Sequence, residues 1–263
     1  MGKKVKKSSK ANRSNSNQEK KVRIDQLLLE KGLAADLKEA QALIMAGKVL
    51  GNEQKILKPS EMLENSSKLR LLGRSKFVSR GGEKLEGAIK AFGLEDAFKD
   101  QVALDIGAST GGFTHCLLQY GAKTVIALDV GSNQLAWSLR SHPQVISLEK
   151  TDIKVFDCDR FPALDWVVAD ISFNGLGRLA PYIVRAGGKR TQFLLMVKPQ
   201  FELSAADVPK GGVVIDEKKR QIAISSVEKS FQKEGLRLQG VEDSIVLGRT
   251  GNKEAFLYFG PED

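Results

Sequence analysis

A glycine-rich segment at residues 105–114 is the part of the sequence whose residue types most clearly predict chemistry. It reads Asp-Ile-Gly-Ala-Ser-Thr-Gly-Gly-Phe-Thr and follows a short apolar run. Glycine lets a ligand approach backbone N–H groups closely. Three other residues separate Gly107 from Gly111, so the spacing is not that of NAD or FAD sites. Asp105, just before the first glycine, favours S-adenosylmethionine, and the alternative is a structural tight turn.

Two further acids could complete a nucleoside site. Asp129 lies 24 residues after Asp105 and ends the next apolar run, where a carboxylate can accept both hydroxyls of a ribose. Asp152 follows a possible strand at 145–148. A carboxylate there can bind an adenine amino group, and a helix-capping or loop role is equally compatible with it. The loop, the following helix and Asp129 together predict an adenosine-type cofactor.

A carboxylate and a lysine end two more apolar runs. Asp170 follows residues 167–169, and Lys198 follows residues 194–197. If these runs are parallel strands, both side chains emerge at the carboxyl edge of the sheet, where open α/β sheets bind ligands. An unpaired buried ammonium is costly, so Lys198 needs a partner. An ion pair with Asp170 could support the fold, or the same proximity could serve catalysis.

Lys84 and Glu254 could complete a set with these two residues. Lys84 lies in Ser-Arg-Gly-Gly-Glu-Lys-Leu at 79–85, and Glu254 lies in Gly-Asn-Lys-Glu-Ala-Phe at 251–256. Taken singly, each is typical of an exposed surface charge. Only their context favours a chemical role.

The elements that would position these residues alternate along the chain. Short apolar runs suited to strands buried on both faces are separated by helical stretches that end at Gly121, Gly187 and Gly235. This alternation predicts an α/β fold, a parallel sheet with helices on both sides. Near the end, Ser244–Leu247 and Glu254–Phe259 flank turn-forming residues and predict an antiparallel hairpin that closes the sheet.

A smaller α+β unit precedes this region, at residues 22–73. Apolar residues from Ile24 to Leu28 have helical spacing, and Gly32 is a stop signal. Asp36 can cap a second helix that stops at Gly47. Short strands around turns follow.

Charge is concentrated in the first 21 residues. Of the net charge of +9, residues 1–21 contribute +7, because they hold eight Lys or Arg and a single acid, Glu19. The remaining 33 bases and 31 acids give +2. A flexible, disordered basic arm that binds nucleic acid is one interpretation, and a solubilising tail is equally compatible.

Composition excludes several other classes of protein. In a chain of 263 residues, 41% hydrophobic and 28% charged residues are ordinary for a globular protein. No apolar run reaches membrane-spanning length. Cys116 and Cys158 have neither CxxC spacing nor a nearby pair of histidines, so no metal site or disulfide is predicted. A cytoplasmic location is the natural expectation, and the sequence is silent on oligomeric state.

The small unit resembles the RNA-binding domain shared by small-subunit ribosomal protein four and pseudouridine synthases. The resemblance rests on Arg-Ile-Asp-Gln-Leu-Leu at 23–28, Ala40, Ile44, Gly-Lys-Val at 47–49 and Lys-Pro-Ser at 58–60. It departs at residues 36–38, where that domain usually carries Ser-Arg. The resemblance implies that this unit binds RNA. Because RNA is a polyanion, we expect Arg23, Lys38 and Lys48, together with the basic arm, to supply much of the attraction.

Four motifs together resemble the TlyA family, a branch of the FtsJ-like ribose 2'-O-methyltransferases fused to that RNA-binding domain. They are Ser-Arg-Gly-Gly-x-Lys-Leu, the segment at 105–114, Asp-Ile-Ser-Phe at 170–173 and Lys-Pro-Gln-Phe-Glu at 198–202, in the family's order. The resemblance implies a Rossmann-like methyltransferase sheet and methylation of cytidine ribose in rRNA of the small subunit, the large subunit or both. Its catalytic tetrad maps onto Lys84, Asp170, Lys198 and Glu254, and its S-adenosylmethionine site onto Asp105, Gly107, Gly111, Asp129 and Asp152.

We therefore expect a basic arm at 1–21, an RNA-binding domain at 22–73, a linker at 74–79 and a methyltransferase domain at 80–263. Methylation of base amino groups is disfavoured, because residues 170–173 lack the proline that shapes a base slot. Cytosine C5 chemistry needs a nucleophilic cysteine, which neither Cys116 nor Cys158 resembles. Two alternatives remain open: a membrane-active haemolysin, a name given to some family members, and a non-catalytic rRNA assembly factor.

Overall fold

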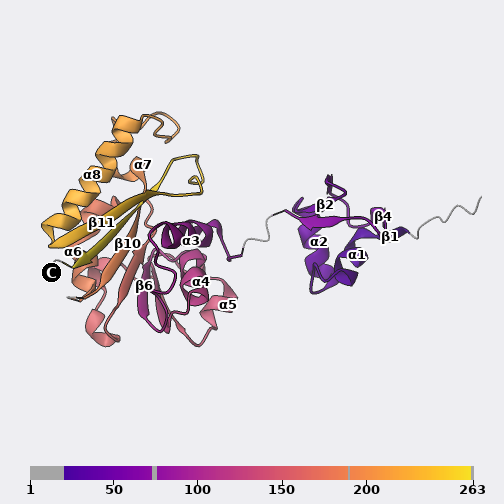
Figure 1. Ribbon diagram of the computed structural model, residues 1–263, viewed down its shortest axis with the longest axis horizontal. Helices are drawn as coiled ribbons and strands as arrows, with labels where there is room; N and C mark the ends of the chain where they lie inside the picture. Colours follow the sequence, from indigo (N-terminus) through magenta and orange to yellow (C-terminus); the bar gives the residue numbers. More distant parts are fainter. Residues whose placement is uncertain (1–20, 73–75, 189, 262–263) are drawn as a thin grey trace, which may run out of the picture. The chain divides into compact units, whose positions relative to one another are not determined.

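The computed structural model describes residues 21–72, 76–188 and 190–261. It contains two compact units, residues 1–74 and 75–263, and each is considered by itself (Figure 1). Residues 1–20 of the expected arm lie outside the described residues, whereas Lys21 is the first residue of strand β1 (Lys21–Arg23). Residues 74 and 75 of the expected linker also lie outside them.

The first unit begins with the predicted helix pair, α1 (Ile24–Glu30) and α2 (Leu37–Met45). Gly32 has a φ of 65°, a left-handed conformation that favours glycine and ends the first helix. Asp36 caps the second, because its Oδ1 accepts a hydrogen bond of 2.7 Å from the N–H of Glu39. The sequence signals for both helix boundaries are thus confirmed.

Short strands complete this unit. They are β2 (Val49–Gly51), β3 (Gln54–Ile56), β4 (Met62–Glu64) and β5 (Leu69–Leu71). Strands β3, β2 and β5 form an antiparallel sheet, and β4 pairs with β1. Between these strands and the helix pair lies a small core that includes Ile24, Leu27, Leu28, Ile44 and Val49.

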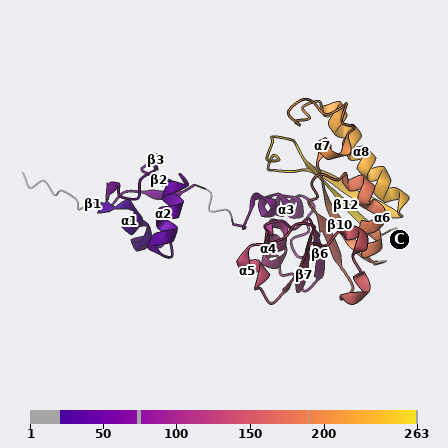
Figure 2. The same ribbon diagram turned by 180° about the vertical axis from the view of Figure 1, so that it is seen from behind.

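The second unit is built on a sheet of seven strands, in the order β11-β12-β10-β9-β6-β7-β8 (Figure 2). Strands β8, β7, β6, β9 and β10 are parallel, whereas β12 runs antiparallel to β10 and β11 antiparallel to β12. The bounds are β6 (Val102–Ile106), β7 (Thr124–Asp129), β8 (Val145–Glu149), β9 (Trp166–Ala169), β10 (Gln192–Val197), β11 (Leu236–Asp243) and β12 (Ala255–Pro261).

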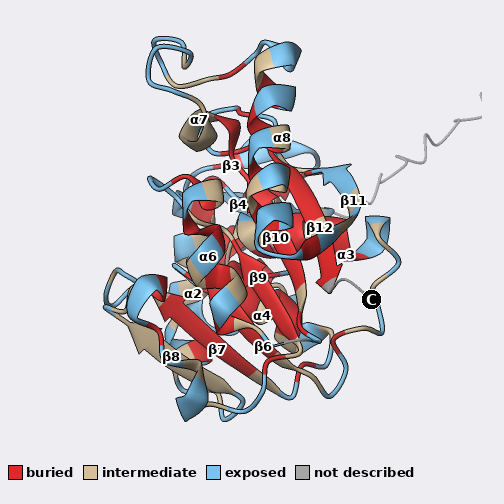
Figure 3. Ribbon diagram, turned by 90° about the vertical axis from the view of Figure 1, so that its left-hand side faces the viewer, coloured by how far each residue is buried: buried red, intermediate tan, exposed pale blue. Residues whose placement is uncertain are grey.

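Helices cover both faces of this sheet. Successive side chains of a strand point to opposite faces, so Val167 and Ala169 pack with helices α6 and α8, while Trp166 and Val168 pack with α3 and α4. Figure 3 shows the central strands buried along their length. The predicted α/β class is confirmed. The helical elements are α3 (Arg80–Ala91), α4 (Gly112–Gln119), α5 (Trp137–Arg140), η1 (Ile153–Val155), η2 (Cys158–Arg160), α6 (Leu176–Ala186), α7 (Pro199–Glu202) and α8 (Glu217–Lys233).

The predicted closing hairpin is wrong in its first strand. Strand β11 is Leu236–Asp243, and the ladder runs from Leu236 opposite Pro261 to Asp243 opposite Ala255. Residues 244–254 form a loop in which Ile245 and Leu247 are 70% and 54% exposed. As an edge strand with a bulge, β11 buries only part of its length. Because β11 contains charged residues, its pattern did not predict a strand. The apolar residues at 245–247 were instead predicted, wrongly, to form one.

No helix in the described part of the chain has both the length and the apolar composition that crossing a membrane requires.

Candidate functional site

The glycine-rich loop follows β6 and leads into α4. Gly107 has a φ of 81°, and a Cβ placed there would lie 2.7 Å from the backbone oxygen of Asp170. Gly111 has a φ of 94°, and a Cβ there would lie 2.3 Å from a methyl carbon of Leu139. Both positions therefore require glycine. The consequence is a loop that packs tightly against the carboxyl ends of neighbouring strands.

A pocket of about 260 Å³ lies beside this loop, and Gly107, Asp129 and Asp152 all line it. The carboxylate of Asp129 accepts N–H bonds from Ser109 and Gly131, each of 2.7 Å. Asp152 caps the short helix η1 by accepting from the N–H of Lys154 at 3.0 Å. The capping alternative for Asp152 therefore holds, and the residue lines the pocket as well.

Neither Asp105, in β6, nor Gly111, at the end of the loop, is among the residues that line the pocket. Asp105 is fully buried. Its Oδ2 accepts a hydrogen bond of 2.6 Å from the hydroxyl of Thr114, whereas Oδ1 has no hydrogen-bond partner among the described residues. Burial raises the pKa of Asp105 to about 7. A cationic group that reached Oδ1 would be favoured there.

A second cavity, of about 540 Å³, holds the four charged residues of the expected tetrad. They form two ion pairs. The Nζ of Lys84 lies 2.5 Å from Oε2 of Glu254, and their side chains are 9% and 3% exposed. The Nζ of Lys198 lies 2.5 Å from Oδ1 of Asp170, with side-chain exposures of 10% and 23%. Two buried ammonium groups are thus neutralised by two carboxylates.

The order of the strands explains why these residues meet. Asp170 follows β9 and Lys198 follows β10, and the two strands are parallel neighbours. Because β12 is antiparallel to β10, with Ala255 opposite Val197, its beginning lies at the carboxyl end of β10. Glu254, directly before β12, therefore reaches the edge where Lys198 emerges. The fourth residue, Lys84, comes from α3.

Sequence reasoning missed several residues of this cavity. The Nζ of Lys198 donates a hydrogen bond of 2.7 Å to the hydroxyl of Ser172. Phe173 has a φ of 71°, is 89% exposed and lines both pockets. Arg249 and Thr250 reach the cavity from the loop before β12. Ser172 and Phe173 could have been found, because they belong to the same Asp-Ile-Ser-Phe motif as Asp170. Arg249 and Thr250 belong to the closing hairpin, whose first strand was predicted wrongly.

The two pockets adjoin each other. Both are lined by Gly107, Ser109, Asp170, Ser172 and Phe173. A ligand in the smaller pocket would therefore lie next to a second ligand in the larger one, with the pair of Asp170 and Lys198 at the boundary. This arrangement suits transfer of a group between two bound molecules.

In the first unit, the expected RNA contacts differ in their surroundings. The Nη2 of Arg23 lies 2.7 Å from Oδ2 of the buried Asp25. This contact lowers the pKa of Asp25 below its usual value. Lys38 and Lys48 are exposed. The two lysines are therefore available to a phosphate, whereas Arg23 shares its charge with Asp25.

Comparison with known proteins agrees with this two-part organisation. Residues 77–260 match the family model described as FtsJ-like methyltransferase, and residues 22–67 match the S4 domain. The chain is 39% identical over 242 residues to the 16S/23S rRNA (cytidine-2'-O)-methyltransferase TlyA of Mycobacterium tuberculosis, covering 91% of this chain and 90% of that protein.

Two other relatives carry a different name. Hemolysin A of Brachyspira hyodysenteriae is 34% identical, with 90% of this chain and 99% of that protein covered. The solved structure "Putative hemolysin from Streptococcus thermophilus" is 33% identical with a TM-score of 0.71, over 92% of this chain and 89% of that one.

Proposed function

This chain belongs to the FtsJ-like methyltransferase family, and from that premise we propose that it methylates the 2'-hydroxyl of cytidine ribose in ribosomal RNA. The methyl donor is S-adenosylmethionine, and the substrate is the small subunit, the large subunit or both. The single observation that carries the proposal is the pair of adjoining pockets, with Lys198 and Asp170 at their boundary.

The residues of the smaller pocket fit the donor. Asp129 ends a strand where a carboxylate can accept ribose hydroxyls, and Asp152 lies where it can accept an adenine amino group. Asp105 does not line this pocket, but its buried, unpartnered Oδ1 would suit an ammonium group that reached it. Gly107 and Gly111 keep the loop in a shape that any side chain would obstruct. Bound there, S-adenosylmethionine would supply an electrophilic methyl group on a sulfonium.

The larger cavity would hold and activate the acceptor ribose. The ammonium of Lys198 forms an ion pair with Asp170 and donates a hydrogen bond to the hydroxyl of Ser172. Since an ammonium has three N–H donors, a remaining donor can contact the 2'-oxygen. As an ammonium Lys198 would orient the hydroxyl, with Asp170 balancing its charge, whereas deprotonation would require Lys198 to be the neutral amine, which accepts the proton. Lys84 and Glu254, paired beside them, would hold the ribose and the lysine in place.

The S4 domain, with Arg23, Lys38 and Lys48, and the basic arm would supply attraction to the RNA. Each phosphate neutralised by a lysine or arginine makes binding weaken as salt is added. We therefore assign RNA binding to residues 1–73 and chemistry to the second unit. Action on ribosomal subunits would take place in the cytoplasm.

The test is methyl incorporation into purified ribosomal subunits from a labelled donor, followed by mapping of ribose methylation in the RNA. Lys198→Ala should lower the transfer rate by about a hundredfold or more and leave the affinity for the donor nearly unchanged. Lys219→Ala is the matched control, because Lys219 forms an ion pair with Asp207 and neither residue lines either pocket. A Lys198→Ala protein that still transfers the methyl group would contradict the role given to Lys198.

The hemolysin name of two relatives favours a second candidate, action on membranes. Leakage of lipid vesicles tests it directly. The same incorporation assay separates the enzyme from an rRNA-binding assembly factor, which would need the first unit but not Lys198.

A further inference from the structure

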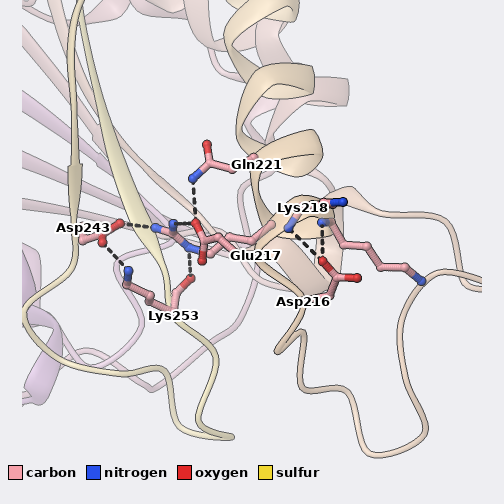
Figure 4. A network of polar contacts seen from close by, with 8 residues as sticks. Asp216, Glu217, Lys218, Gln221, Asp243 and Lys253 are labelled. Carbon is pink, nitrogen blue, oxygen red and sulfur yellow. Dashed lines mark hydrogen bonds and ion pairs between the residues drawn. The ribbon is translucent and has the colours of Figure 1, made fainter.

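A buried arginine on α8 contacts the segment that carries Glu254. Arg220 is 3% exposed, and its Nε donates a hydrogen bond of 3.0 Å to the backbone oxygen of Lys253. Its Nη1 lies 2.8 Å from Oε1 of Glu217, and its Nη2 contacts Asp243. The side chain of Lys253 lies 2.6 Å from the other oxygen of Asp243. Figure 4 shows Glu217, Asp243 and Lys253 converging from α8, β11 and the end of the loop.

This contact lies at the end of the β11–β12 ladder, where the backbone is held by fewer hydrogen bonds than within the sheet. The last pair of the β11–β12 ladder joins Asp243 and Ala255. Beyond it, the backbone oxygen of Glu254 accepts one hydrogen bond, from Ser244 at 2.9 Å. The carbonyl oxygen of Lys253 and the Cα of Glu254 lie in one planar peptide group. A hydrogen bond that holds this oxygen therefore also restricts where the Cα of Glu254 lies.

Stability alone does not account for a guanidinium in this place. Replacing a buried ion pair by apolar residues is often neutral or stabilising, so burial of the charge is weak evidence for a stabilising role. What the planar fork of an arginine provides is several hydrogen bonds in a fixed geometry. Here the fork ties α8, β11 and the residue before Glu254 together.

The carboxylate of Glu254 has close neighbours on both of its oxygens, so it can move little without losing a contact. Its Oε2 lies 2.5 Å from the Nζ of Lys84. On the other side, a Cβ at Gly248 would lie 2.5 Å from Oε1, so the loop packs closely on the same carboxylate. A small tilt of the backbone at residue 254 would therefore break the pair with Lys84.

We propose that Arg220 is a positioning residue, which acts through the backbone of Lys253 to hold Glu254 against Lys84. The proposal rests on the proposed function, in which that pair holds the acceptor ribose. Its prediction is that loss of the guanidinium slows transfer while the donor pocket, lined by other residues, keeps its affinity.

The first experiment compares Arg220→Met with Phe231→Leu. Phe231 is a fully buried core residue of the same helix, so its truncation lowers stability without changing the contact to Lys253. Single-turnover transfer at saturating donor and RNA should fall by about a hundredfold in Arg220→Met and by no more than about twofold in Phe231→Leu, with donor Kd unchanged in both. An unchanged rate in Arg220→Met, or an equal loss in both variants, would overturn the proposal.

The second experiment needs no catalysis. Crystal structures of the wild type and Arg220→Met should show the Lys84–Glu254 contact in the wild type and its loss in the variant, and an intact contact in the variant would overturn the proposal. If the wild type transferred no methyl group, the proposed function would fail. The distance between Lys84 and Glu254 in the two crystal structures would still decide whether Arg220 positions Glu254. Arg220→Lys, which keeps the charge but lacks the Nε donor, replaces Arg220→Met in both experiments if the latter does not fold.

Discussion

Asp105→Asn should make the stability of this protein less sensitive to alkaline pH. The wild-type carboxyl is fully buried, with Thr114 donating to one oxygen and no hydrogen-bond partner among the described residues for the other. Burial raises its pKa from 3.8 to about 7, and the neighbouring charge of Asp170 acts in the same direction. The folded protein therefore prefers the neutral acid.

The sign of the effect follows from proton linkage. A group whose pKa is higher in the folded state stabilises fully below its unfolded pKa, and this contribution is lost as pH rises through the folded pKa. A difference from 3.8 to about 7, at about 1.4 kcal/mol per pH unit, corresponds to a limit of about 4 kcal/mol. Between pH 5 and pH 8, the share lost is about 2–3 kcal/mol.

Urea unfolding at pH 5 and pH 8, followed by the fluorescence of the buried Trp166, measures this difference. The wild type should lose about 2–3 kcal/mol more than Asp105→Asn over that interval. Asp96→Asn, at an exposed position, makes the same chemical change and should retain the wild-type slope. Equal slopes for the wild type and Asp105→Asn would refute the reasoning.

Calorimetry of donor binding supplies the functional half of the same experiment. In the proposed site, an ammonium of the donor next to Asp105 would favour the ionised carboxylate, so wild-type affinity should rise as pH increases through about 7. Asp105→Asn should bind the donor more weakly and without this rise. Asp105→Asn would then be more stable than the wild type at alkaline pH but would bind the donor more weakly. This combination is expected if the buried carboxyl serves to bind a ligand and not to stabilise the fold.

Three further predictions concern the loop, the first unit and the tetrad. Gly107→Ala should unfold at a lower temperature than Gly93→Ala: both place alanine at a positive φ, at a cost of about 1 kcal/mol, but only position 107 also lacks space for a Cβ. Removal of residues 1–73 should raise the KM for ribosomal subunits by about tenfold or more and flatten its salt dependence, with donor Kd unchanged. Glu254→Gln should slow single-turnover transfer without weakening donor binding, because Glu254 lines only the larger of the two pockets.

Residues that end strands could be predicted from sequence because their position follows from local pattern. Asp129, Asp170 and Lys198 each end a continuous apolar run, and a strand buried on both faces must be apolar along its length. Parallel strands bring their carboxyl ends to one edge, so the proximity of Asp170 and Lys198 could be expected before any coordinates.

Contacts that depend on how the antiparallel strands pair could not be found in this way. Glu254 meets Lys84 only because β12 is antiparallel to β10, with Ala255 opposite Val197. Strand β11 contains charged residues and a bulge, so its pattern did not predict a strand. The loop that brings Arg249 to the cavity contains the predicted turn at 248–252 but is longer, at 244–254. Arg220 shows a related limit: it lies in the helical spacing of the buried face of α8, three and four residues before Ala223 and Ile224, but the sequence does not show which groups its guanidinium contacts.

The charge distribution explains why one chain combines these two units. In the candidate catalytic cavity, the lysines at 84 and 198 are each paired with a carboxylate, so these four groups carry no net charge. The sequence beyond residue 21 has a net charge of only +2, against +7 for residues 1–21. A tetrad neutralised in this way can orient a neutral hydroxyl, and the positive charge left in the cavity comes from Arg80 and Arg249, which also line it. In the proposed function, most of the attraction to RNA would come from the basic arm, where the net charge is concentrated. Charge-reversing substitutions among residues 3–21 should then change the KM for RNA but not the rate of transfer at saturation.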